Sequence, residues 1–181
     1  MSAVYLIDGY NLLFAMGVLH GRAGPHGLEK ARLRLLGLLH GVHGDESGAV
    51  TVVFDAAHAP PGVAAELDYQ GLHVRFAVGE QEADDLIELL IGQAAAPKDL
   101  TVVSDDHRIQ QAGRRRHCIV QGCQDYLDWL DHHRRQSRPQ PLEAPEKPPG
   151  ADKQHWLAEF ADLDEDPDMK DVFDPFGFEK E

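Results

Sequence analysis

Aspartate side chains stand at the ends of several apolar runs in this sequence. Three runs end in this way, at Asp8, at Asp55, and at the pair Asp105 and Asp106, and a further pair, Asp84 and Asp85, opens a helical pattern. If the runs are parallel strands, their carboxyl ends meet at one edge of a sheet, where open α/β folds bind ligands. Carboxylates that lie this close raise one another's pKa unless a cation neutralises them. The pattern therefore predicts a site for a hard divalent metal ion.

The ligand types indicate which ion this is and what it does. Carboxylate, amide and water oxygens suit Mg²⁺ or Mn²⁺, and no set of cysteine and histidine with zinc spacing lies nearby. Cys118 and Cys123 are too few for a disulfide framework and are expected to be small residues in and beside a buried strand. A hydrated ion activates water as a nucleophile, and a second ion about 4 Å away stabilises the leaving oxygen of a phosphodiester. Phosphodiester hydrolysis is the reaction that this site suits best.

Each aspartate also has an ordinary structural explanation. Asp8 with Gly9 is a good turn dipeptide, and Asp84 and Asp85 suit the first turn of a helix. Asp106 is expected to cap the helix that follows it rather than to bind metal. Only the joint pattern favours a metal site, because several acids at one sheet edge rarely arise by accident.

The elements that must position these residues follow from hydrophobic periodicity. Apolar runs predict strands at Val4–Ile7, Val50–Phe54, Leu72–Val78, Leu100–Ser104 and Cys118–Gln121. Amphipathic spacing predicts helices at Leu28–His40, Glu80–Ala96, Asp106–Ala112 and Cys123–Arg135. Strands that alternate with helices imply right-handed crossovers and a parallel sheet covered on both faces. The predicted fold class is α/β, with a mainly parallel sheet of about five strands between two helical layers.

Composition divides the chain into three parts. Residues 1–136 are predicted to form the folded domain, 137–153 a proline-rich linker, and 154–181 a disordered acidic tail that contains aromatic residues. Residues 137–181 hold 13 acidic and 5 basic side chains, and residues 1–136 hold 18 and 12, so only −6 of the net charge of −14 belongs to the predicted domain. The acidity therefore does not exclude a nucleic-acid partner. No apolar run reaches the length of about 20 residues that spans a bilayer, and no signal-peptide pattern opens the sequence, so a cytoplasmic protein without membrane contact is expected.

Four short motifs can be compared with known families: Leu6–Leu12 with its Asp8-Gly9-Tyr10-Asn11 core, Val53–Ala56, Glu82–Ile87 and Val102–Asp105. Their order and spacing over about residues 3–135 resemble NYN domains, a branch of the PIN-like nucleases, and within it the bacterial YacP-like subfamily. The resemblance implies a Rossmann-like three-layer α/β/α fold and a metal-dependent endonuclease for single-stranded RNA. The best-known member of the subfamily is a ribosome-associated endoribonuclease that cuts mRNA, so ribosome-associated mRNA is the implied partner.

The resemblance also implies roles for single residues. The implied metal-binding acids are Asp8, Asp84 and Asp105. Asn11 is implied to orient a water or a substrate phosphate, and Asp85 to bind a second ion through water. Asp55, at the rim, and Asp106 are weaker metal candidates. No role is assigned to His58, because its loop contains an extra residue relative to the family pattern.

Basic residues are expected to hold the RNA phosphates, which supply most of the affinity of such proteins. The densest basic cluster consists of Arg114, Arg115 and Arg116. Arg108 lies one helical turn after the fourth motif, within reach of a phosphate near the metal. Tyr10 is expected to stack on a base or to pack beside the strand end. Lys30, Arg32 and Arg34 line the first long helix, and a solvated face is expected for Lys30 and Arg34.

The predicted function is metal-dependent hydrolysis of single-stranded RNA, and two alternatives stay open. One is a non-catalytic RNA- or ribosome-binding module with the same fold, which has no need of three mutually repelling acids. The other is a PIN-like DNA nuclease, although the chain lacks the DNA-binding insertions of such enzymes. The tail is expected either to dock on a protein partner through its aromatic side chains or to cover the basic surface as an autoinhibitory RNA mimic.

Overall fold

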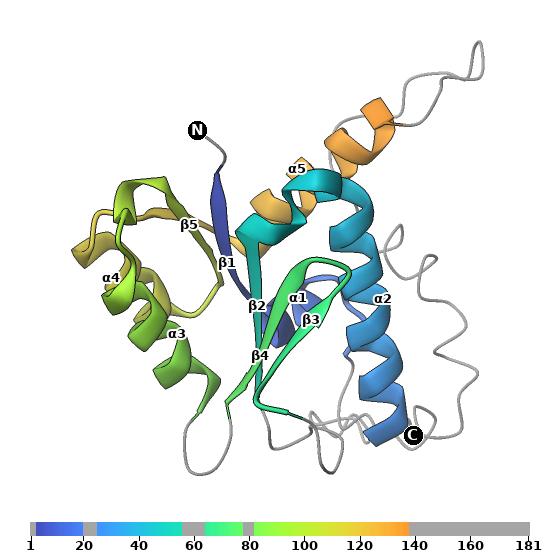
Figure 1. Ribbon diagram of the computed structural model, residues 1–181, viewed down its shortest axis with the longest axis horizontal. Helices are drawn as coiled ribbons and strands as arrows, with labels where there is room; N and C mark the ends of the chain where they lie inside the picture. The colour runs from blue at the N-terminus through green and yellow to red at the C-terminus, as the bar shows by residue number, and fades with distance from the viewer. Residues whose placement is uncertain (1–2, 20–24, 56–63, 78–81, 138–181) are drawn as a thin grey trace, which may run out of the picture.

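The computed structural model describes residues 3–19, 25–55, 64–77 and 82–137. These residues form a six-stranded sheet with the order β3-β4-β2-β1-β5-β6, in which only the β3–β4 pair is antiparallel (Figure 1). The strands are β1 (Val4–Asp8), β2 (Val50–Asp55), β3 (Glu66–Tyr69), β4 (Leu72–Ala77), β5 (Leu100–Val103) and β6 (Ile119–Gln121). The predicted fold class, a mainly parallel α/β sheet, is confirmed.

Helices cover both faces of the sheet. They are α1 (Gly9–Ala15), α2 (Pro25–His43), α3 (Ala83–Gln93), α4 (His107–Arg115) and α5 (Cys123–Ser137), with 3-10 turns at Gly44–Ala49 and Pro97–Asp99. Figure 1 shows α3 and α4 on one side of the sheet and α2 and α5 on the other. None of the described helices is long and apolar enough to cross a membrane.

Alternate residues of the central strands pack into two separate cores. Ile7 belongs to the larger core, which α1, α2 and α5 complete, whereas its neighbour Leu6 belongs to the smaller core under α3 and α4. Val52 and Val53 divide between the same two cores. Because side chains alternate across a strand, this division is what a central strand with both faces buried requires.

The structure adds two elements that sequence patterns did not predict. The strand β3 pairs with β4 and takes the edge of the sheet, so the predicted strand at Leu72–Val78 has a neighbour on each side. The helix α1 begins directly after β1, where Asp8 and Gly9 had indicated a turn. Val78, Glu80, the loop around His58, and the predicted linker and tail from residue 138 onward lie outside the described residues.

One edge of the sheet gathers the strand ends that matter for the site. The strands β1, β2, β4 and β5 run in the same direction and end at Asp8, Asp55, Ala77 and Val103, and we call this the carboxyl edge. Asp8 pairs in register with Val53, and Ile7 with Val103, so the neighbouring strands end close to β1. Because β1 lies at the centre of the sheet, Asp8 occupies the middle of the carboxyl edge.

A buried histidine connects α2 to α5 in the larger core. The His43 side chain is 8% exposed, and its Nε2 lies 2.8 Å from the hydroxyl oxygen of Tyr126. Its ring packs on Tyr5, 4.9 Å between centroids, and on Trp129, at 5.3 Å. Burial lowers the pKa of His43 from 6.5 to about 4; the Glu46 charge acts against this shift and the His133 charge adds to it.

This histidine makes the stability of the fold depend on pH. Between pH 4 and 6.5 the unfolded chain binds the proton more readily than the folded chain, so the stabilisation is present above pH 6.5 and is lost as the pH falls toward 4. We expect the loss to reach up to about 3 kcal/mol. Urea unfolding at a series of pH values should show a shallower decline for His43→Gln than for the wild type. Equal slopes in the two proteins would contradict the assignment.

Candidate active site

Asp8 is the most deeply placed acid of the carboxyl edge. It is 6% exposed and caps α1, because its Oδ1 accepts the backbone N–H of Asn11 at 3.1 Å. Its Oδ2 accepts the Asn11 side-chain amide and the Ser104 hydroxyl, each at 3.2 Å. The structure thus brings Asp8 and Asn11 together, and the Asn11 side chain orients this carboxylate directly. The implied role of Asn11 toward a water or a substrate phosphate stays a prediction.

Three acids at the carboxyl edge lie close enough for their charges to affect one another. Burial raises the pKa of Asp8, the hydrogen bonds from Asn11 and Ser104 act against that shift, and the Asp106 charge adds to it. The pKa of Asp84 is also raised, first by burial and then by the charges of Asp106 and Asp8, while the Arg108 charge opposes the shift. Asp8, Asp84 and Asp106 therefore repel one another, which is the condition that a bound cation would relieve.

The adjacent acids Asp105 and Asp106 point to different helices. Asp105 is exposed, and its Oδ1 accepts the backbone N–H of Cys123 at 2.9 Å, at the start of α5. Asp106 is the N-cap of α4, because its Oδ1 accepts the N–H groups of Arg108 and Ile109 at 2.7 and 3.1 Å. The predicted capping role of Asp106 is confirmed. The Asp106 charge also raises the pKa of Asp8 and of Asp84. Asp106 therefore caps α4 and is at the same time one of the mutually repelling acids.

Asp105 faces the side of the edge where Cys123 is buried. Burial raises the pKa of the Cys123 thiol, and the charges of Asp105 and Asp8 add to that shift. Both carboxylates thus lie near this thiol, on the α5 side of β1. The implied metal-binding role of Asp105 stays a prediction.

Ser104 is a site residue that sequence patterns did not single out. The side chain is fully buried, and its Oγ donates to Asp8 and accepts the backbone N–H of Asp106 at 3.1 Å. Its carbonyl oxygen accepts the Gln110 side-chain amide at 2.9 Å, which ties the loop to α4. The sequence did hold a signal that could have identified Ser104: its hydroxyl lies between an apolar strand and an acidic pair. A polar group buried at such a place needs a hydrogen-bond partner.

Arg108 and Asp85, predicted to bind RNA and metal respectively, contact each other. Arg108 Nη2 lies 2.5 Å from Asp85 Oδ1, and its Nε lies 2.7 Å from Glu88 Oε1. The arginine side chain is 50% exposed, and the two acids are 43% and 28% exposed. Exposed ion pairs of this kind contribute little stability, so a phosphate can replace the acids as the partner of Arg108.

The basic cluster of Arg114, Arg115 and Arg116 lies away from the carboxylates. All three residues are exposed at the end of α4 opposite its Asp106 cap, and Arg116 donates to the Ala94 carbonyl at 3.2 Å. With a rise of about 1.5 Å per residue, eight residues of helix separate Asp106 from Arg114 by about 12 Å. These arginines extend the charged surface rather than line the site.

Tyr10 lies on the β2 side of the carboxyl edge, near Asp55. Its ring is partly exposed and meets Phe54 edge-on, with 5.3 Å between centroids. The hydroxyl oxygen accepts a hydrogen bond from Arg32 Nη1 at 2.7 Å. Burial raises the pKa of Tyr10, the Arg32 charge lowers it, and the Asp55 charge raises it. The structure therefore places Tyr10 and Asp55 together at the rim.

In the part of the chain that the structure describes, no three histidine, cysteine, aspartate or glutamate side chains are arranged to enclose a metal ion. A closed cage of protein ligands is thus not what these residues form. They suit an ion that keeps most of its waters, because Mg²⁺ typically binds one or two carboxylates together with substrate phosphates. The repulsion between Asp8 and Asp84 and their oxygen chemistry fit such an ion.

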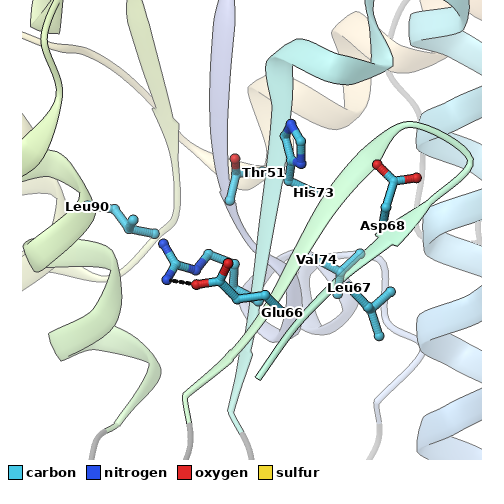
Figure 2. A pocket seen from close by; sticks show the side chains of 8 residues that line it. Thr51, Glu66, Leu67, Asp68, His73, Val74 and Leu90 are labelled. Atoms are coloured by element: carbon cyan, nitrogen blue, oxygen red, sulfur yellow. Dashed lines mark hydrogen bonds and ion pairs between the residues drawn. The ribbon is translucent and has the colours of Figure 1, made fainter. Parts of the chain in front are cut away.

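A pocket of about 410 Å³ lies apart from these acids, between the β3–β4 hairpin and α3 (Figure 2). Figure 2 shows Glu66 on one side of the pocket, with Thr51 and His73 on another. Glu66 forms an ion pair with Arg75, which also lines the pocket. Thr51 lies four residues, or about 13 Å of strand, before Asp55. None of the predicted site residues lines this pocket.

Comparison with known proteins agrees with the fold and the motifs. The model of the YacP-like NYN domain matches residues 5–162, a range that holds every predicted site residue and continues past residue 136. The crystal structure of a tryptophan-to-leucine mutant of Rae1 (YacP) from Bacillus subtilis is similar, with 22% identity and a TM-score of 0.57 over 75% of this chain and 79% of that one. A second crystal structure of Rae1 (YacP) from Bacillus subtilis has 24% identity and a TM-score of 0.56 over 74% and 76%.

Identity of this level shows a shared fold, and the match to the family model carries the assignment. No curated protein is similar enough to count as a match. The family match covers most of the chain, including β1 with its D-G-Y-N motif and the carboxyl edge around it. The chain therefore belongs to the YacP-like NYN domain family, a branch of the PIN-like nuclease superfamily.

Proposed function

We propose that this protein is a metal-dependent endoribonuclease that hydrolyses phosphodiester bonds in single-stranded RNA. The observation that carries the proposal is the Asp8 carboxylate, which is buried, oriented by Asn11 and Ser104, and repelled by Asp84 and Asp106. Such an arrangement costs free energy in a protein that only folds or binds. It is useful where a divalent cation must be held at a fixed point.

Asp8 and Asp84 are the proposed ligands of Mg²⁺ or Mn²⁺, with Asp105 and Asp106 as further candidates. Among described contacts, Asp8 Oδ1 accepts one hydrogen bond and Oδ2 accepts two, so Oδ1 keeps a lone pair for a ligand. When bound, the ion would neutralise charge on the phosphate and lower the pKa of a water nucleophile. Asn11 keeps the Asp8 carboxylate in one orientation, which preserves the geometry of the site.

The remaining residues of the edge suit a single strand of RNA. Arg108, close to Asp84 and exposed, is the proposed phosphate ligand, and it exchanges Asp85 and Glu88 for the substrate. Tyr10, at the Asp55 end, is the proposed contact for a base. Family membership further supports mRNA in a ribosome-associated setting as the substrate.

Metal removal tests the proposal directly. The purified protein is incubated with single-stranded RNA, single-stranded DNA and duplexes, in Mn²⁺, in Mg²⁺ and in EDTA. We expect internal cleavage of single-stranded RNA that needs the metal, stops in EDTA and returns when Mn²⁺ is restored. RNA that binds but is never cut with any metal would identify a binding module, and equal cleavage of DNA would identify a DNA nuclease of the same fold.

A further inference from the structure

Arg32 is a buried arginine behind the carboxyl edge. It lies on α2, is only 4% exposed, and has its guanidinium carbon 5.7 Å from the centre of the Phe76 ring. Its Nη1 donates to the hydroxyl oxygen of Tyr10 at 2.7 Å. Burying a guanidinium costs free energy, and an apolar side chain of similar length would fill this space without that cost. The position therefore calls for an explanation beyond packing.

Arg32 contacts a set of aromatic residues that lie next to one another at the edge. Phe76 stacks on Phe54 with 5.9 Å between centroids, and Phe54 meets the Tyr10 ring at 5.3 Å. Arg32 joins the two ends of this series, because it lies over Phe76 and donates to Tyr10. Phe54 and Phe76 are the penultimate residues of β2 and β4, so the set lies directly beneath the carboxyl edge.

Tyr10 connects this set to the acids. It is followed in α1 by Asn11, whose backbone and side-chain N–H groups both donate to Asp8. The Tyr10 ring is partly exposed, beside Asp55, whereas its hydroxyl is turned toward α2. Tyr10 is thus anchored to α2 through its hydroxyl, while the residue stays partly exposed beside Asp55.

We propose that Arg32 is a positioning residue that fixes the Tyr10 ring as a stacking surface for a base of the RNA strand. The inference rests on the proposed function and adds a determinant of RNA binding to it. Arginine suits the task because its planar guanidinium donates to the phenol while its face lies over Phe76. A lysine ammonium keeps the charge but cannot make both contacts in one fixed geometry.

The test measures binding of a short fluorescein-labelled single-stranded RNA in EDTA, so that cleavage plays no part. We expect Arg32→Met to raise the Kd at least about fivefold, the lower end of what one base–aromatic stack contributes. Lys30→Met, which removes the same charge from an exposed position of the same helix, is expected to leave the Kd within about twofold, because a single surface charge contributes little. If Arg32→Met does not fold, Arg32→Lys takes its place.

A double-mutant cycle separates positioning from other roles. In the Tyr10→Ala background, Arg32→Met should add no further loss of RNA binding, since the ring that Arg32 fixes is gone. An equal loss in both backgrounds would overturn the inference, because Arg32 would then act without Tyr10. A lower unfolding temperature with an unchanged Kd would overturn it too, because the role would be structural only.

The same measurements separate this inference from the proposed function. Wild-type protein that binds RNA but never cuts it with Mn²⁺ would refute the nuclease proposal, while the cycle would still decide the role of Arg32. Wild-type protein that cuts RNA, together with variants whose Kd is unchanged, would refute only the role of Arg32. Wild-type protein that neither binds nor cuts RNA would refute both.

Discussion

Asp8→Asn is expected to lower the rate of RNA cleavage roughly a thousandfold, because several kcal/mol of transition-state stabilisation depend on the charge that holds the metal. The free energy of unfolding should fall by no more than about 1–2 kcal/mol, because the two bonds that Oδ2 accepts from Asn11 and Ser104 must reverse or be lost, and two effects oppose this loss. Asparagine is as good an N-cap as aspartate, so the bond from the Asn11 N–H is kept. The pKa of Asp8 is raised by burial, so removal of its charge also removes a desolvation cost.

Cleavage of RNA in Mn²⁺ and urea unfolding of the same preparation measure the two effects. The matched control is Asp128→Asn, an exposed acid on α5 that accepts a bond from Gln124, and its activity should equal that of the wild type. Loss of activity that accompanies loss of structure would show that Asp8 acts as a helix cap. Undiminished cleavage would remove Asp8 from the proposed site altogether.

Gly9→Ala is expected to destabilise the fold by about 3 kcal/mol or more, at the upper end of the cost of overpacking a core. A Cβ at this position would lie 2.2 Å from Phe54 Cε1 and 2.7 Å from Cζ. The Phe54 ring is fully buried and stacked on Phe76, so it has no free space into which to move. The glycine of the D-G-Y-N motif is therefore required for close approach, not for a turn.

Urea unfolding of three variants tests this explanation. Adding Phe54→Leu to Gly9→Ala should recover part of the stability, because the smaller side chain makes room for the new methyl group. Gly92→Ala is the control, since its Cβ meets nothing within 4 Å and a helical alanine is favoured over glycine by about 0.5–1 kcal/mol. If Gly9→Ala were as stable as the wild type, the ring would have to move more freely than its packing indicates.

Sequence patterns predicted β1, β2 and β5 well because these strands lie inside the sheet and consist almost wholly of apolar residues. The strand β3 escaped notice because Glu66–Tyr69 carries two acids in four residues and owes its form to pairing with β4. The helix α1 escaped notice because Asp8 and Gly9 resemble a turn, and only the approach of Phe54 explains the glycine. Tertiary contacts decided both cases.

The site was predicted as a set of residue types more successfully than as a geometry. The motif spacing singled out Asp8 and Asn11 as site residues. It could not show which way the side chains of Asp105 and Asp106 point, because adjacent side chains diverge. Sequence reasoning also predicted that Arg108 contacts an RNA phosphate, but it did not predict the ion pairs of Arg108 with Asp85 and Glu88. Arg32 was hidden among the basic residues of α2, since a helix pattern does not show which cation a neighbouring aromatic cluster covers.

The way the helices start has a consequence for how an acidic protein can receive a polyanion. At the start of each of the helices α1, α4 and α5, an aspartate carboxylate accepts one or more of the first N–H groups. Each helix start carries the equivalent of about half a positive charge. Three such partial charges converge on the carboxyl edge and offset the capping acids there. Under the proposed function, the backbone itself would moderate the field that an approaching phosphate chain meets, without any additional lysine or arginine.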